Sequence, residues 1–300
     1  MQTKITMARI AFQGEPGAFS EHAARHYFGA AVAMQPWPYF ADLFEAVQKE
    51  LAEAAIVPIE NSLTGSILQN YDLLLRYAVV ITGEIILRIG QHLMALPGVH
   101  EGDLRRVFSH PQALDQCRNF LSARPQLERV PAVDTAGSAK MIAARQLRDA
   151  AAIAGERAAT VYGLEILQRH IEDDPQNFTR FLMIEKTAAA AARPQERQKT
   201  SVVFSTRDKP GSLYRALGVL ASRGINLLKI ESRPQAGLPW QYRFYLDLEG
   251  DAESDACQVA LRELAEMASD VRVLGSYAKG RVIGEAPSST SESSRCNISD

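Results

Sequence analysis

Four short polar segments of this sequence have residue types suited to binding an anion. They stand at 14–20 (GEPGAFS), 59–66 (IENSLTGS), 109–112 (SHPQ) and 134–138 (DTAGS). Each follows an apolar run typical of a strand, and most open a helical pattern. In open α/β sheets ligands bind outside the carboxyl ends of the strands, and helix N-termini offer backbone N–H groups to anions. The four segments therefore predict one binding cleft at an edge of a sheet.

The elements that must position these turns alternate between strand and helix patterns, which is typical of a largely parallel α/β sheet. The run 78–96 is long and rich in β-branched residues, so we expect one or two strands there and no helix. Leu43, Val47 and Leu51 recur at helical spacing. Further strands are expected near 8–15, 54–61, 107–108, 128–133, 151–155 and 178–186.

Helix boundaries follow from capping signals and apolar stripes. Ser20 is placed to cap a helix over the next residues, and Asp42 and Glu45 have the spacing of a capping box. Two other helices are expected from apolar stripes, one with Ile67, Tyr71 and Leu74 on one face and one with Leu114, Cys117 and Leu121 in register. Two more are expected at 136–148 and from about 155 to 168.

The order of elements changes after an alanine-rich, charged segment at 186–200, which resembles a linker. Beyond it the pattern predicts strand, helix, strand, strand, helix, strand, the ferredoxin-like order. The last sixteen residues contain six serines and predict a disordered tail.

Composition excludes several classes of protein. With 33 Lys+Arg against 35 Asp+Glu the net charge is −2, which argues against a dedicated nucleic-acid binder. No apolar run is long enough for a membrane span, and the first residues lack a secretory h-region. The three cysteines form no CxxC pair, which fits a reducing cytoplasm without a zinc cage. His22 and His26 have chelating i, i+4 spacing, but no third ligand is evident.

The turns together resemble monofunctional prephenate dehydratase, a bilobal catalytic domain fused to a C-terminal ACT regulatory domain. The matching segments run in collinear order from residue 8 to about 280; they are GEPGAFSEHAA, PIENSLTGS, SHPQALDQC, AAIAGERAA, NFTRF, RDKPGSLYRAL and INLLKIESRP. The resemblance implies a periplasmic-binding-protein-like α/β domain at 1–186, a linker at 187–199, an α+β ACT domain at 200–284 and a tail at 285–300.

The resemblance implies conversion of prephenate to phenylpyruvate, without a metal or other cofactor. Thr179 matches the family's catalytic hydroxyl, Glu60 and Asn61 match a catalytic-site pair, and Ser109 and Gln116 match polar positions near them. Because a threonine hydroxyl is a poor acid, we favour its donation of a hydrogen bond to the departing oxygen over outright proton transfer. Ser109 could instead serve as a helix N-cap, and Gln116 could simply be solvated.

Four further residues are assigned to substrate binding: Ser20, Thr135, Ser138 and Arg180. Thr135 and Ser138 stand at a helix start suited to a carboxylate, although capping alone would explain them. Arg180 follows Thr179 directly and should point to the opposite face of a regular strand, so a structural ion pair is an equal alternative.

The ACT resemblance implies feedback inhibition by L-phenylalanine. The family motif GALV stands here as Gly211, Ser212, Leu213 and Tyr214, so two positions depart from it and leave effector affinity and selectivity open. The assigned effector residues are Gly211, Ser212, Leu213, Asn226, Glu231, Ser232, Arg233 and Pro234. Because such modules usually pair, we expect a homodimer or homotetramer.

Two rival functions stay open on the sequence alone. Arogenate dehydratase would keep the fold and remove the same groups from the amino-acid analogue of prephenate. A non-catalytic amino-acid sensor would share the bilobal fold, but it would have no reason to keep 177–181 (NFTRF) together with 59–61 (IEN).

Overall fold

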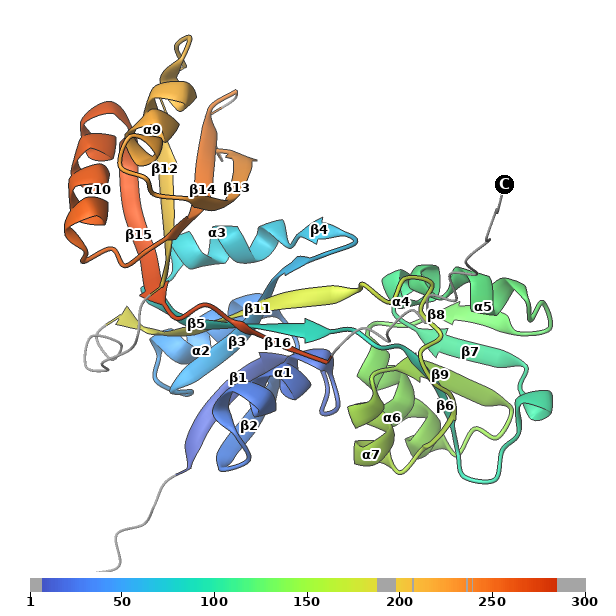
Figure 1. Cartoon of the computed structure of the whole chain (residues 1–300). Coiled ribbons are helices and arrows are strands. Elements are labelled where there is room, and N and C mark those ends of the chain that lie inside the picture. Colours follow the sequence, from blue (N-terminus) through green and yellow to red (C-terminus); the bar gives the residue numbers. More distant parts are fainter. Residues whose placement is uncertain (1–6, 188–197, 207, 236, 239, 285–300) are drawn as a thin grey trace, which may run out of the picture.

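The computed structural model describes residues 7–187, 198–206, 208–235, 237–238 and 240–284. Most of the predicted linker at 187–199 and the whole predicted tail at 285–300 lie outside these residues. Figure 1 shows two lobes side by side and a third module above the first lobe. None of the helices in the described ranges combines the length and apolar character needed to cross a membrane.

The first lobe is built on a seven-stranded sheet in the order β16-β5-β11-β3-β1-β2, with β4 paired to β3. Its core contains Ile10, Phe12, Ile56, Val57 and Ile184, which are buried. The strands are β1 (Ala8–Gln13), β2 (Val32–Trp37), β3 (Ala54–Asn61), β4 (Gly65–Ser66), β5 (Val79–Arg88), β11 (Phe178–Lys186) and β16 (Arg281–Ile283), and the helices are α1 (Phe19–Phe28), α2 (Phe40–Gln48) and α3 (Leu68–Arg76).

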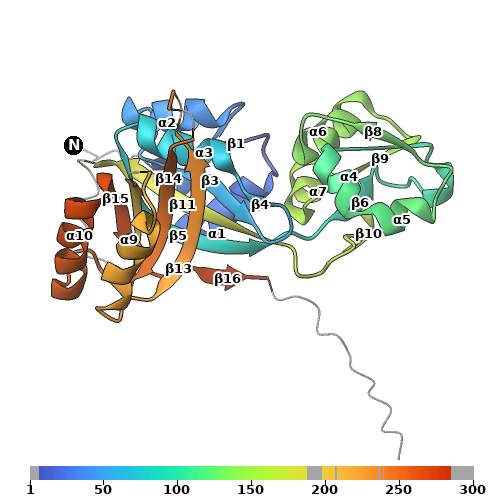
Figure 2. The ribbon, with the colours of Figure 1, turned by 90° about the horizontal axis from the view of Figure 1, so that it is seen from above.

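The second lobe has a five-stranded sheet in the order β10-β6-β9-β7-β8. Its core is rich in alanine on the central strand β9 and on α6. The strands are β6 (His92–Ala95), β7 (Arg106–Ser109), β8 (Glu128–Pro131), β9 (Ala150–Ala154) and β10 (Glu165–Gln168), with a 3₁₀ turn η1 (Glu101–Asp103) and helices α4 (Pro111–Gln116), α5 (Arg118–Ser122), α6 (Thr135–Arg145) and α7 (Glu156–Tyr162). Two segments, 89–91 and 169–177, join the lobes (Figure 2).

The prediction of a largely parallel sheet holds for only part of each lobe, because both sheets are mixed: β1 pairs in parallel with β2 and β3, and β7 with β8 and β9. β11 is antiparallel to β3 and to β5, and β6 is antiparallel to β9 and to β10. The reason is that β5 leaves the first lobe and β11 returns to it, so neither is part of a local β-α-β crossover. The edge strand β2, which contains Pro36, was absent from the prediction.

Several predicted helix boundaries are also wrong. Ser20 lies inside α1, whose N-cap is Ala18, and α2 begins at Phe40 with Tyr39 as N-cap, so Asp42 and Glu45 form no capping box. Phe40 packs against the core, which places the helix start at an apolar contact.

Two of the other predicted helices are interrupted. The helix expected through Cys117 breaks there, and the Asp173 carboxylate accepts the Arg118 and Asn119 N–H groups that open α5. The helix expected to reach residue 168 ends at Gly163, which has φ +65°, and β10 follows.

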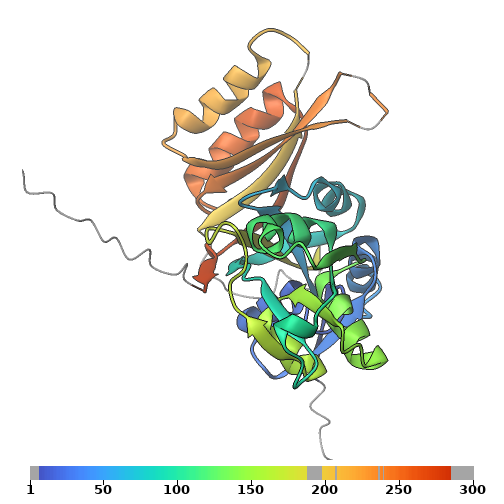
Figure 3. The same ribbon diagram turned by 90° about the vertical axis from the view of Figure 1, so that its right-hand side faces the viewer.

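The third module confirms the predicted strand, helix, strand, strand, helix, strand order. Its sheet has the order β13-β14-β12-β15, and both helices cover one face, away from the lobes (Figure 3). The elements are β12 (Lys199–Ser205), α9 (Ser212–Ala221), β13 (Leu227–Pro234), β14 (Tyr242–Glu249), α10 (Asp255–Met267) and β15 (Ser269–Tyr277). The range predicted for this module, 200–284, also includes β16, which joins the first-lobe sheet in parallel with β5.

Candidate active site

A pocket of about 400 Å³ lies between the two lobes, where β3 ends and β11 begins. Both lobes and the segment 89–91 between them contribute side chains to it. Its lining comprises Gln13, Phe19, Ser20, Phe40, Pro58, Asn61, Thr64, Ile67, Ile89, Gln91, His110, Gln112, Ala113, Gln116, Val133, Asp134, Thr135, Thr179 and Phe181. The four predicted polar segments therefore all contribute to one cleft.

Asn61 and Thr179 face each other on adjacent strands. They are paired in register between β3 and β11, so their side chains share a face of the sheet. Asn61 Nδ2 donates to Thr179 Oγ1 at 3.0 Å and to Asn177 Oδ1 at 2.7 Å. Asn61 Oδ1 accepts the Leu63 and Thr64 N–H groups, each at 3.1 Å, and this fixes which side of the amide points at Thr179.

The direction of that hydrogen bond determines what the Thr179 hydroxyl can do. Since its oxygen accepts from Asn61, its own proton is free to donate to another group. Thr179 is only 8% exposed and lines the pocket, so a pocket-bound oxygen is the available acceptor. The arrangement is suited to stabilising negative charge that develops on an oxygen in the pocket.

Three other predicted residues also reach the pocket: Ser20, Gln116 and Thr135. Gln116 ends α4, where its Oε1 lies 3.4 Å from Gln91 Nε2. Thr135 is the first residue of α6, whose N-cap is Asp134. With Asn61 and Thr179, five of the nine predicted catalytic and substrate-binding residues meet here.

Glu60 and Arg180, predicted as catalytic and substrate-binding residues, do not line this pocket. Each precedes or follows a pocket residue on a strand, and alternate strand residues point to opposite faces. Glu60 Oε1 accepts from Lys229 Nζ at 2.8 Å. Arg180 Nε donates to Glu84 at 2.6 Å and Nη1 to Asp247 at 2.5 Å, so the structural ion pair is the alternative that the geometry favours.

Ser109 and Ser138 are also outside the pocket lining, because both hydroxyls are bonded to the backbone. The Ser109 hydroxyl donates to the Ile153 carbonyl at 2.6 Å, which ties β7 to β9. The α4 N-cap is His110 and not Ser109. The Ser138 hydroxyl donates to the Asp134 carbonyl at 2.8 Å inside α6. Both serines therefore support the pocket wall from behind.

Sequence reasoning missed Gln91, which is 2% exposed and lines the pocket. Its Oε1 has no hydrogen-bond partner among the described residues, and a buried polar atom without a partner is costly unless a ligand or water satisfies it. The sequence offered no turn signal for it, because Gln91 falls within the run 78–96 that predicts strands, in the short segment between β5 and β6. Asn177, which holds Asn61, was quoted only as part of a motif.

The pocket carries little formal charge of its own. Within the described part of the chain its lining includes no lysine or arginine, and its one carboxylate, Asp134, caps α6 by accepting from Gly137 N–H. The groups suited to an anion are the amide and hydroxyl donors of the lining and the first turns of α1 and α6, of which α6 already holds the Asp134 carboxylate. In the described ranges, no three histidine, cysteine, aspartate or glutamate side chains lie close enough to hold a metal ion.

Glu21 joins the two lobes behind the pocket. Its carboxylate accepts from the Gly17 N–H at 2.6 Å, from Arg25 at 2.8 Å and from Arg157 of the second lobe at 2.7 Å. Burial raises the pKa of Glu21, but the bonds from Arg157, Gly17 and Arg25 outweigh it and lower the pKa to about 2.

We predict that Glu21 stabilises the fold above pH 4.5 and that this contribution disappears as the pH falls to about 2. The sign follows because the folded state holds the proton less tightly than the unfolded state. The difference in unfolding midpoint between the wild type and Glu21→Gln should therefore shrink over that interval. Glu45→Gln, on an exposed helix pair, is the control. A difference that stays constant with pH would contradict the prediction.

A family model described as prephenate dehydratase matches residues 10–189, more than half of the chain. The chain belongs to the prephenate dehydratase family. A second model, the ACT domain, matches residues 200–256. The expected family and fold class are thereby confirmed, and the chain is an enzyme of a dehydratase family.

Known relatives agree with this family. The chain is 48% identical over 278 residues to "Arogenate dehydratase/prephenate dehydratase 2, chloroplastic" of Arabidopsis thaliana, covering 90% of this chain and 72% of the relative. It is similar to the solved prephenate dehydratase of Arthrobacter aurescens in complex with L-Phe, with 34% identity, TM-score 0.82 and coverage of 91% and 90%. It is also similar to GqqA, described as a novel type of quorum quenching acylase, with 35% identity, TM-score 0.83 and coverage of 91% and 98%.

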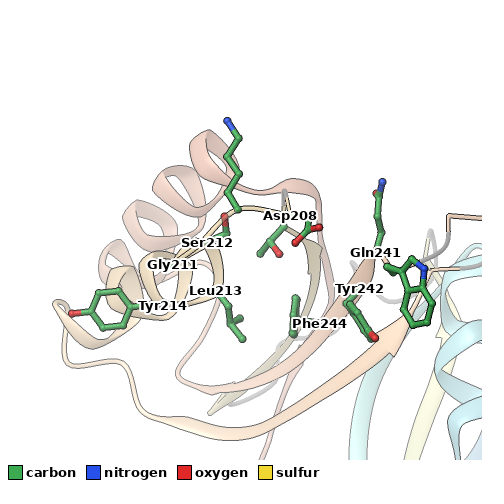
Figure 4. A pocket seen from close by; sticks show the side chains of 11 residues that line it. Asp208, Gly211, Ser212, Leu213, Tyr214, Gln241, Tyr242 and Phe244 are labelled. Carbon is green, nitrogen blue, oxygen red and sulfur yellow. The ribbon is translucent and has the colours of Figure 1, made fainter.

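The ACT domain of this chain has its own pocket of about 390 Å³ (Figure 4). Gly211, Ser212 and Leu213, which belong to the altered GALV motif, line it. Tyr214 also lines it but is 80% exposed and extends away from the other labelled side chains. The remaining lining residues are Thr206, Asp208, Lys209, Trp240, Gln241, Tyr242 and Phe244.

The other five predicted effector residues do not line this pocket. Asn226 donates to Glu249 at 3.2 Å, at the far end of β13. Glu231 and Arg233 bond to Ser66 and Asp72 of the first lobe. Ser232 and Pro234 are on the same strand, opposite the pocket residues Phe244 and Tyr242. Residues 231–234 (ESRP) thus lie beside the pocket wall, and two of their side chains are directed at the catalytic domain.

Proposed function

We propose that this chain converts prephenate to phenylpyruvate, carbon dioxide and water, as a step of L-phenylalanine biosynthesis. The observation that carries the proposal is the Thr179 hydroxyl, which Asn61 orients and which has its proton free toward a pocket between the lobes. The family supplies the reaction class, and the site supplies a donor where the reaction needs one.

In the proposed reaction the bond between the ring and its carboxylate breaks, and its electron pair enters the ring as the ring C–O bond breaks. The hydroxyl departs with the electron pair of the C–O bond and takes a proton from solvent to become water, the carboxylate leaves as carbon dioxide, and aromatisation drives both cleavages. Thr179 donates a hydrogen bond to the departing oxygen, where negative charge develops. Asn61 holds Thr179 in place and does not itself need to exchange a proton.

The two carboxylates of the substrate would be held by dipoles and neutral donors. The first turns of α1 and α6 meet the pocket at Ser20 and Thr135, and Gln91 and Gln116 lie near α4. This accounts for a dianion site with no lysine or arginine in the described lining. Glu60, Ser109, Ser138 and Arg180 are not proposed to touch the substrate.

The experiment that tests the proposal compares steady-state turnover of prephenate and arogenate by the purified chain. We expect the larger kcat/KM on prephenate, measured as phenylpyruvate formation. A larger value on arogenate would support the alternative dehydratase, whose substrate has an amine in place of the ketone. No turnover of either would support the amino-acid sensor. The likeness to GqqA extends to the sequence, but its description as an acylase is a statement about that protein.

We also propose feedback inhibition by phenylalanine bound in the ACT pocket. The similar enzyme of A. aurescens was solved with L-Phe, and the pocket here has an aromatic wall with backbone N–H groups at the start of α9. L-phenylalanine should therefore lower the rate and change the fluorescence of Trp240, with D-phenylalanine as the control. Trp240→Phe should lose the fluorescence change but keep the heat of binding. No heat and unchanged kinetics would refute the inhibition.

The oligomeric state and the cellular location of the chain are also proposals. A homodimer or homotetramer is proposed because the ACT sheet ends in an open edge, β13, with Leu228 and Ile230 40% and 43% exposed. A cytoplasmic location is proposed from composition alone. Several similar plant enzymes are named chloroplastic, which is a statement about those proteins.

A further inference from the structure

Strand β13 of the ACT domain has two faces with different neighbours. Residues paired in register share a face, so Ser232 lies on the side of Phe244, a wall of the ACT pocket. Glu231 lies on the side of Tyr245, whose hydroxyl donates to the Tyr71 carbonyl of the first lobe at 3.2 Å. Consecutive residues of one strand therefore point alternately at the effector pocket and at the catalytic domain.

The face toward the catalytic domain contacts the hairpin of β3 and β4. Lys229 Nζ donates to Glu60 Oε1 at 2.8 Å and to Ser66 Oγ at 3.1 Å. Ser66 Oγ donates in turn to Glu231 Oε2 at 2.5 Å. The Lys229 side chain is 14% exposed and that of Glu60 35%, so this contact is partly shielded from water. Glu60 and Ser66 are themselves paired across the hairpin.

The loop of the same hairpin carries part of the substrate pocket. It begins at Asn61, whose side chain holds the turn through the Leu63 and Thr64 N–H groups. Thr64 Oγ1 accepts from Gln112 Nε2 of the second lobe at 2.9 Å, across the pocket. One loop is thus held between ACT residues on one side and the opposite lobe on the other.

We propose that Lys229 is a positioning residue for this loop, which it holds through Glu60 and Ser66, and that β13 carries the effect of a bound effector to the substrate pocket. The inhibitory effect rests on the proposed feedback function, whereas the positioning effect applies without effector. Loss of Lys229 leaves the Glu60 carboxylate without its cation beside Asn61. Because the loop lines the pocket, substrate affinity should change more than the chemical step.

The test measures KM and kcat for prephenate with and without L-phenylalanine, together with calorimetric binding of L-phenylalanine. Lys229→Met should raise KM about threefold or more with kcat within about twofold, and should reduce the effect of saturating phenylalanine about fivefold. Phenylalanine binding should persist. Lys229→Arg should retain most of both effects, since it keeps the cation. In the double variant with Glu60→Gln, KM should return toward the wild-type value.

Arg272→Met is the matched control. Arg272 is another half-buried cation at this domain contact, but it donates to the Leu75 carbonyl at 3.2 Å, away from the loop. It should leave KM and inhibition near wild type. The proposal is overturned if Lys229→Met has wild-type KM and inhibition, or if both variants lose them equally. A wild type that binds no phenylalanine refutes the feedback function alone, and the KM comparison without effector then still decides the positioning role.

Discussion

Thr179→Val should lower kcat on prephenate by about 10²–10³-fold, the usual effect of removing one donor to a developing oxyanion. Valine keeps the shape of threonine and removes only the hydroxyl. Asn61 Nδ2 keeps two acceptors, Asn177 Oδ1 at 2.7 Å and the Phe178 carbonyl at 3.0 Å, so the amide is not left unpaired. KM should therefore change little, and the loss should appear in kcat.

Thr179→Ser separates the role of the hydroxyl from the role of the strand. Serine keeps the donor and loses one methyl group, so it should recover a large part of the activity that valine loses. Thermal unfolding should show that both variants fold like the wild type. If Thr179→Val turned over prephenate at the wild-type rate, another group would have to assist the departing hydroxyl, and the proposed role of Thr179 would be wrong.

The sequence predicted the two residues at the centre of the pocket because the signals for them are local in the sequence. Asn61 ends β3, and Thr179 lies at the start of β11. Short apolar runs predicted both strands, and the motif around each residue identified it. The sequence could not tell which face each neighbour takes, since that depends on the partner layer. Glu60 and Arg180 are next to pocket residues, yet the ACT sheet covers their face and provides Lys229 and Asp247.

The errors in strand pairing have one physical origin. Periodicity reveals that a strand exists, but pairing partners are set by tertiary contacts. The strand β11 was predicted at its observed bounds, and its antiparallel pairing depends on residues more than a hundred positions away in β3. In the ACT domain the order of elements was predicted correctly, but its strand pairing is no more local, since β12 pairs with both β14 and β15 of the other half. Gln91 was missed because it lies between lobes, in no recognisable turn.

A buried ionic cluster under the pocket joins the catalytic and ACT sheets. Arg180 bonds to Glu84 and Asp247, Lys199 Nζ donates to Glu84 at 2.7 Å, and the Gly280 N–H donates to Glu84 at 2.8 Å. The side chains of Arg180, Glu84 and Asp247 are 12%, 2% and 10% exposed. Burial lowers the pKa of Arg180, but the nearby negative charges of Asp247 and Glu84 raise it above its ordinary value, so this guanidinium stays charged.

Arg180→Met should cost about 3–5 kcal/mol of folding free energy, because it leaves two buried carboxylates with one remaining lysine between them. The exposed pair Arg106–Asp149 gives the matched control, and Arg106→Met should cost less than about 1 kcal/mol. Since the cluster spans both sheets, calorimetry should show the ACT and catalytic domains unfolding together in the wild type and apart in Arg180→Met.

A double variant identifies the cause of that loss. If the damage comes from an unpaired carboxylate, Arg180→Met with Asp247→Asn should be more stable than Arg180→Met alone, because the second change removes the carboxylate that has lost its arginine, while Glu84 keeps Lys199. If it comes from lost packing of the arginine side chain, the second change should bring no recovery. Equal unfolding of Arg180→Met and Arg106→Met would show that the cluster contributes no more than a surface pair. The domains would then be held mainly by their other contacts, such as the ion pair of Lys229 with Glu60 and the packing of Tyr71 on Tyr245, whose ring centroids are 4.8 Å apart.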